Sequence, residues 1–133
     1  MSETAGPADI LVVEDEPVSR TLLTGLLERE GYTLAVAEQG GQALTYLRSH
    51  PRPRLILLDL VMPYVDGWAF LRERQRLPAL SAVPVVVFSS VGGLEGPDPL
   101  RLGAAEILLK PFDVVKVLDV ARRYCRVGAG GDV

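Results

Sequence analysis

Short apolar runs alternate with amphipathic stretches along this chain, and the alternation predicts its architecture. Near-continuous apolarity over strand length indicates burial on both faces, which is the habit of a parallel sheet. The chain has five such runs: ILVV at 10–13, TLAVA at 33–37, LILLDL at 55–60, VPVVVF at 83–88 and EILL at 106–109. We therefore expect an α/β fold, a doubly wound five-stranded parallel sheet with helices on both faces.

The segments between these runs carry apolar residues at helical spacing. They predict four helices, each with one apolar face toward the sheet. The residues that mark these faces are Val18, Leu22, Leu23, Leu26 and Leu27 in the first, Ala43, Leu44 and Leu47 in the second, Phe70 and Leu71 in the third, and Val114, Val117, Leu118 and Ala121 in the last.

The stretch VGGLEGPDPLRLG at 91–103 is less regular. A right-handed crossover between the last two strands calls for a helix there, but the glycines and prolines oppose one. We expect a fourth helix that is short or irregular, near 98–102. Residues 1–8 and 128–133 are small, polar or Gly-rich and are predicted to be flexible tails around one domain at 9–127.

Composition narrows the class of protein. The 133 residues suffice for one domain, and 48 % hydrophobic against 23 % charged residues is typical of a soluble globular chain. The sequence predicts neither a membrane span nor a secretory leader, and Cys125 has no second cysteine to pair with, so we expect a cytoplasmic location. A net charge of −3 argues against direct nucleic-acid binding, which needs a basic face.

Polar side chains follow four of the five strand-like runs. Glu14 and Asp15 end the first, Asp59 the third and Ser89 the fourth, and Lys110 follows the fifth. The carboxyl ends of parallel strands meet at one edge of a sheet, where ligands bind in open α/β folds. We therefore expect these five side chains to converge.

Three converging carboxylates repel one another unless a cation compensates them, and Mg²⁺ prefers such oxygen ligands. Asp15 and Asp59 are predicted to be direct ligands, and Glu14 to act through a water molecule. Lys110 and Ser89 are predicted to contact phosphoryl oxygens. A carboxylate can be the nucleophile in phosphoryl transfer, and Asp59 is placed for that role.

Each residue also has an ordinary structural interpretation. Asp15 or Glu16 could cap the first helix, with Pro17 in its first turn. Asp59 could be a turn residue, Ser89 a strand-end hydroxyl and Lys110 a surface lysine. These interpretations treat each position separately and do not predict that all of them fall at one edge of the sheet.

Four motifs, in this order and spacing, make the sequence resemble the receiver domain of bacterial two-component response regulators, the CheY-like family, over residues 9–126. The motifs are Glu14-Asp15, LILLDLVMPYVDG at 55–67, VPVVVFS at 83–89 and LGAAEILLKPF at 102–112.

The resemblance implies the strand order 2-1-3-4-5 and phosphorylation of Asp59 by a histidine kinase or phosphotransfer protein, with Mg²⁺ bound. It also implies that the backbone carbonyl of Val61 is a metal ligand and that Lys110-Pro111 is a cis bond. Phosphorylation would then draw Ser89 and Lys110 inward and change the affinity for a downstream protein that the sequence does not identify.

The sequence departs from the family pattern in places. Ile107 stands where the family often has an aromatic switch residue, and Glu14 replaces a common Asp. Val61 and Val91 occupy positions that tune dephosphorylation in the family. Neither side chain can orient an attacking water, so we expect a long-lived acyl phosphate.

The preferred hypothesis is a stand-alone signalling switch, because the chain is too short for an output domain. It would not be an enzyme beyond catalysing its own Mg²⁺-dependent phosphorylation and dephosphorylation. The alternative is a receiver-like adaptor that binds proteins independently of phosphorylation.

Two other classes fit poorly. A haloacid-dehalogenase-type phosphatase needs a second Asp where Val61 stands, and a flavodoxin-like protein needs a phosphate loop where the acidic triplet 14–16 would repel phosphate. We assign no role to Trp68, Cys125 or His50.

Overall fold

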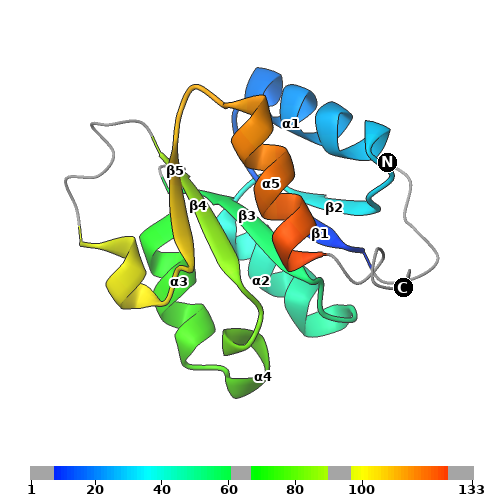
Figure 1. The fold of residues 1–133 in the computed structure, drawn as a ribbon. Coiled ribbons are helices and arrows are strands. Elements are labelled where there is room, and N and C mark those ends of the chain that lie inside the picture. Colours follow the sequence, from blue (N-terminus) through cyan, green and yellow to red (C-terminus); the bar gives the residue numbers. More distant parts are fainter. Residues whose placement is uncertain (1–7, 61–66, 90–96, 126–133) are drawn as a thin grey trace.

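The computed structural model describes residues 8–60, 67–89 and 97–125, in which a five-stranded sheet lies between two layers of helices (Figure 1). The described elements, in chain order, are β1 (Ile10–Val13), α1 (Pro17–Arg29), β2 (Leu34–Ala37), α2 (Gly40–Ser49), β3 (Leu55–Asp59), α3 (Gly67–Gln75), α4 (Pro78–Ser81), β4 (Val85–Ser89), the 3₁₀ helix η2 (Pro99–Leu102), β5 (Glu106–Leu109) and α5 (Val114–Tyr124).

The strand order is β2-β1-β3-β4-β5 and every neighbouring pair is parallel, which confirms the predicted topology. The register sets Val13 opposite Leu58 and Asp59 opposite Phe88. Ser89 in turn lies opposite Leu109. The strands therefore end nearly level, and the residues that follow them share one edge of the sheet.

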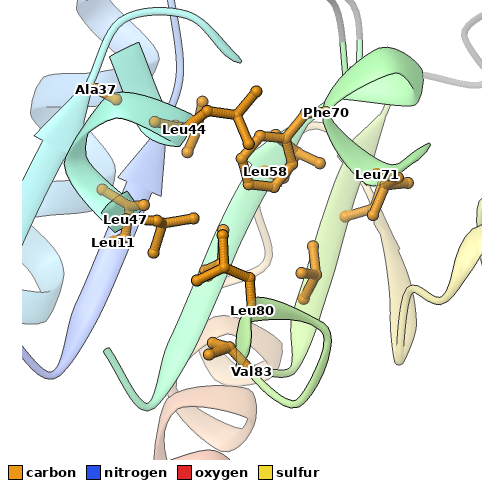
Figure 2. Packing of buried hydrophobic residues seen from close by; sticks show 14 of the residues in the cluster. Leu11, Ala37, Leu44, Leu47, Leu58, Phe70, Leu71, Leu80 and Val83 are labelled. Atoms are coloured by element: carbon orange, nitrogen blue, oxygen red, sulfur yellow. The ribbon is translucent and has the colours of Figure 1, made fainter. Parts of the chain in front are cut away.

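Successive residues of each strand point to opposite faces, so each face has its own apolar core. Leu11 and Leu58 point toward α2, α3 and α4, where they pack with Phe70, Leu71 and Leu80 (Figure 2). Their neighbours on the strands point to the other face, under α1 and α5. This two-sided burial explains why the strands read as continuous apolar runs.

The first helix packs differently from the prediction. Leu23 and Leu27 are buried against the sheet, but Val18 and Leu22 are 63 % and 62 % exposed. Consecutive helical residues are about 100° apart, so a helix centred on the row of Leu23 and Leu27 turns Leu22 away from the sheet. The prediction that Val18 and Leu22 belong to the apolar core was wrong. Val114 at the start of α5 is likewise exposed.

The crossover between β4 and β5 contains the expected short helix. Residues Pro99–Leu102 form a 3₁₀ helix, with Asp98 as its N-cap and Gly103 in the left-handed conformation at φ 100°. A left-handed C-terminal residue favours glycine, and the short helix ends there. Trp68 of α3 donates its indole N–H to the carbonyl of Pro97 at 2.8 Å. This bond ties the start of α3 to the crossover.

Two further features complete the fold. The short helix α4 was not predicted; Pro78 stands in its first turn, a position that suits proline. No helix in the described part of the chain has the length and apolar character of a membrane span.

Candidate functional site

The predicted carboxylates converge at the carboxyl edge of the sheet. Glu14 and Asp15 follow β1, Asp59 ends β3, and one carboxylate oxygen from each of the three lies within 4.8 Å of the others. Glu14 is only 1 % exposed and Asp59 7 %. Like charges this close, and this poorly hydrated, oppose one another unless positive charge is near.

Lys110 provides part of that positive charge. Its ammonium donates to Glu14 Oε1 at 3.1 Å and lies 3.5 Å from Asp59 Oδ2. Burial lowers the pKa of Lys110, but the carboxylates of Asp59 and Glu14 together raise this pKa by more than burial lowers it. The pKa of Lys110 therefore lies above its ordinary value. The lysine therefore stays charged at neutral pH. The cis peptide between Lys110 and Pro111 agrees with the expectation drawn from the family.

The charge of the cluster suits a divalent cation. Three carboxylates and one ammonium leave two negative charges in a partly buried space. Mg²⁺ is bound by one or two carboxylates together with other oxygen atoms, and the donors gathered here are of that kind. Glu14, Asp15 and Asp59 therefore fit a hard divalent ion.

The loop from β1 to α1 is held by its own hydrogen bonds. Glu16 is the N-cap of α1, and its carboxylate accepts from the amides of Val18 and Ser19. These bonds lower the pKa of Glu16, with the amide of Ser19 as the main cause. The ordinary capping interpretation is thus correct for Glu16. Asp15 does not cap the helix.

The start of α3 lies in close backbone contact with the end of β3. The amide of Gly67 donates to the carbonyl of Leu60 at 2.8 Å. A Cβ atom at Gly67 would lie 2.5 Å from Leu60 Cα and 2.8 Å from the carbonyl oxygen of Asp59. Only glycine permits this approach, so Gly67 fixes the backbone next to the central carboxylate.

The remaining predicted positions are placed as follows. Ser89 is 1 % exposed at the end of β4, one residue beyond the partner of Asp59. Ile107 is partly buried and packs against the core under α2 and α3. Val61 and Val91 lie outside the described residues, so their predicted contributions are not located.

The three residues without an assigned role pack in a core or end a helix. Trp68 is partly buried against the same core as Ile107. Cys125 is a buried thiol on the face under α1 and α5, and His50 follows α2 as its C-cap.

Sequence reasoning missed one residue of this site. The guanidinium of Arg20, on the first turn of α1, donates to the carbonyl oxygens of Glu14 at 3.0 Å and Asp15 at 3.1 Å. An arginine in the first turn of an amphipathic helix looks like a solvated surface residue. Only the fold of the loop shows where its side chain goes.

Comparison with known proteins defines the class. Residues 10–122 match the response regulator receiver domain, so the chain belongs to this family. It is 33 % identical to PilH of Pseudomonas aeruginosa over 80 % of this chain and 88 % of that protein. It is 36 % identical to the alkaline phosphatase synthesis transcriptional regulatory protein SphR of Synechococcus elongatus, and it spans about half of that relative, 51 %.

Solved structures agree with this assignment. The receiver domain of the sensor histidine kinase PA1611 from Pseudomonas aeruginosa superimposes with a TM-score of 0.81 at 28 % identity, over 91 % of this chain and 99 % of the other. That crystal structure has a magnesium ion coordinated in its active-site cleft. Receiver domains are signalling switches of two-component systems, and this chain has their fold and acidic site.

Proposed function

We propose that Asp59 accepts a phosphoryl group from a histidine kinase or phosphotransfer protein. The observation that carries this proposal is the cluster of Glu14, Asp15 and Asp59 beside the ammonium of Lys110. The cluster combines a nucleophile, oxygen donors for a cation and a positive charge for a phosphoryl oxygen. Its likeness to the magnesium-bound PA1611 receiver domain supports the proposal.

In the proposed reaction an oxygen of Asp59 forms a bond to phosphorus as the bond from phosphorus to the donor nitrogen breaks. The electron pair of that bond leaves with the imidazole. Bound Mg²⁺, held by Asp15, Asp59, the Val61 carbonyl and, through water, Glu14, would neutralise the phosphoryl oxygens. Lys110 has a pKa above its ordinary value and contributes a full positive charge.

Lys110 also links the reaction to a change of conformation. Its ammonium contacts the unmodified carboxylates of Glu14 and Asp59, and phosphorylation of Asp59 moves negative charge from that carboxylate to the phosphoryl group. We expect the side chains of Lys110 and Ser89 to move toward the phosphoryl group. This movement shifts a conformational equilibrium at β5, α5 and the crossover that contains η2. The outcome is a changed affinity for a downstream protein.

Exposed apolar side chains beside the site support a protein as the phosphoryl donor. Val18 and Leu22 on α1, and Val114 and Val115 on α5, are all at least half exposed. The two helices begin just after Asp15 and Lys110, so Val18, Val114 and Val115 lie in the first turns that follow the carboxyl edge of the sheet. Apolar surface next to a reactive group suits docking of another protein.

We also propose that the receiver acts as a stand-alone cytoplasmic switch. Its match to PilH extends over most of that relative, 88 %, which supports the stand-alone form. The sole cysteine, Cys125, is a buried thiol, which agrees with a reducing compartment.

The test is phosphorylation with acetyl phosphate, read by intact-protein mass spectrometry. We expect a Mg²⁺-dependent mass gain of one phosphoryl group, which Asp59→Asn abolishes. Following the label after removal of acetyl phosphate tests the long lifetime expected from Val61 and Val91. Decay within seconds contradicts that lifetime, and no labelling at all contradicts the phosphoacceptor role.

An adaptor that binds proteins independently of phosphorylation is the second candidate. It is favoured by Ile107 at the usual aromatic switch position and by the four-residue 3₁₀ helix η2, because both alter the face that normally reports phosphorylation. Equal capture of a binding protein by wild type and Asp59→Asn, with acetyl phosphate and Mg²⁺ present, supports the adaptor.

A further inference from the structure

A guanidinium outside the carboxylate cluster is bonded to the backbone that carries the cluster. Arg20 lies on the first turn of α1, and its side chain, 21 % exposed, reaches back across the loop between β1 and α1. Its Nη1 donates to the carbonyl oxygen of Glu14 at 3.0 Å and to that of Asp15 at 3.1 Å. One nitrogen thus holds two successive peptide groups.

These two peptide groups flank the Cα atom of Asp15. The carbonyl of Glu14 belongs to the peptide before Asp15, and the carbonyl of Asp15 to the peptide after it. Fixing both peptide planes fixes φ and ψ of Asp15, and with them the direction of its Cα–Cβ bond. The base of the Asp15 side chain is therefore set by Arg20.

The surroundings make this clamp rigid. The amide of Glu14 donates to the carbonyl of Ala37 at 3.1 Å, which ties the end of β1 to the end of β2. Nη2 of Arg20 lies 3.8 Å from the carboxylate of Glu38, just beyond β2. Arg20 thus links the loops that follow two neighbouring strands.

We infer that Arg20 is a positioning residue for the metal site: it holds Asp15 in the orientation that binds Mg²⁺. This inference rests on the proposed function. Groups that orient metal ligands commonly contribute tenfold or more to affinity, because a free ligand loses conformational entropy on binding. Arg20 bonds the backbone on either side of the Asp15 Cα atom, so it acts through Asp15.

The test is Mg²⁺ binding by isothermal titration calorimetry in the absence of any phosphoryl donor. We expect Arg20→Ala to weaken Mg²⁺ binding by about tenfold. Arg20→Lys keeps the charge and a donor but not the planar fork, so its affinity should fall between those of Arg20→Ala and wild type. Arg29→Ala is the matched control, because Arg29 lies on the same helix and its Nε donates to the carbonyl of Gly25 within that helix.

Two measurements separate positioning from a general loss of structure. Urea unfolding without Mg²⁺ reports the fold of each variant, and labelling by acetyl phosphate at saturating Mg²⁺ should be restored to the wild-type rate in Arg20→Ala. If Arg20→Ala does not fold, Arg20→Lys carries the test. Glu38→Gln removes the outer ion pair but keeps the clamp, and should bind Mg²⁺ almost as wild type does.

The outcomes also separate this inference from the proposed function. If wild type binds Mg²⁺ and is labelled on Asp59, but folded Arg20 variants bind Mg²⁺ equally well, the positioning role is overturned and the proposed function stands. An equal loss in Arg29→Ala overturns it as well. If wild type neither binds Mg²⁺ nor accepts the label, both fail.

Discussion

At the scale of single residues, the carboxylates of this site repel one another, and the same carboxylates are the donors that a cation needs. Glu14, Asp15 and Asp59 are close enough to share a cation, and Lys110 offsets only part of their charge. Repulsion between these carboxylates lowers the stability of the metal-free protein, and binding of a cation restores that stability. The same proximity of the carboxylates supports the proposal that Asp59 is the phosphoacceptor.

Asp15→Asn tests this balance. Removing one of the crowded charges should raise the free energy of unfolding by about 1 kcal/mol without Mg²⁺, and should abolish the stabilisation that Mg²⁺ gives to wild type. Urea unfolding with and without Mg²⁺ measures both effects. Glu28→Gln, which removes an exposed charge of α1, should change neither. A variant less stable than wild type in metal-free buffer contradicts the role of repulsion.

Burial suppresses the reactivity of the Cys125 thiol. Burial raises the pKa of its thiol to about 12, so almost no thiolate exists near neutral pH. We expect no reaction with Ellman's reagent at pH 8 in the folded protein and rapid reaction after denaturation. Fast stoichiometric labelling of the native protein would show that the end of α5 opens readily.

At the scale of elements, helix ends position the chemistry. Glu16, whose carboxylate accepts from backbone amides, caps the start of α1 next to Asp15. Gly67, the first residue of α3, lies close to the backbone of Asp59 and Leu60. Trp68, the next residue of α3, holds the crossover through its bond to Pro97. The strands provide the edge, and these two helix ends lie next to Asp15 and Asp59.

Gly67→Ala tests the close approach of α3. The added Cβ meets backbone atoms of Asp59 and Leu60 rather than flexible side chains, so we expect a loss of about 1–3 kcal/mol in the free energy of unfolding and weaker Mg²⁺ binding. Gly25→Ala is the matched control. Within α1 its Cβ meets only Arg29 Nη2 at 3.8 Å, so this substitution should stabilise the helix. A neutral Gly67→Ala would contradict the contact.

At the scale of the whole molecule, the edge strand β5 is held by the last helix as well as by β4. Glu106 on β5 accepts hydrogen bonds from Arg123 and Tyr124 of α5. Arg123 also pairs with Asp119 one turn earlier. This network joins the sheet edge to α5 and therefore spans the face where we expect the signal to be read.

The pH dependence of stability tests this network. The hydrogen bond from Arg123 is the main cause that lowers the pKa of Glu106 from its ordinary value of 4.5. A carboxyl with a lowered pKa stabilises the fold above its unfolded pKa, and this contribution is lost as pH falls through the lower folded value. Relative to Glu106→Gln, wild type should therefore lose stability as pH falls below 4.5.

Urea unfolding across that pH range measures the loss. Asp119→Asn, which removes the other partner of Arg123, should keep most of the pH dependence that belongs to Glu106. Parallel pH profiles for wild type and Glu106→Gln would contradict the lowered pKa.

The sequence by itself determined the parallel sheet, its strands and the convergence of Glu14, Asp15, Asp59, Ser89 and Lys110 at one edge. This was possible because continuous apolar runs define buried parallel strands, and such strands aim the residues at their ends the same way. The shortness of the crossover helix followed from its glycines and prolines.

Tertiary structure decided the rest, because it depends on how elements lie against one another. The rotation of α1, which exposes Val18 and Leu22, follows from its packing on the sheet. Arg74 is 3 % exposed and donates to the carbonyls of Ser81 and Val83, which no periodicity predicts for a charged residue. Arg20 likewise looked like a surface residue. A long side chain can reach several partners, and only the folded loops select one.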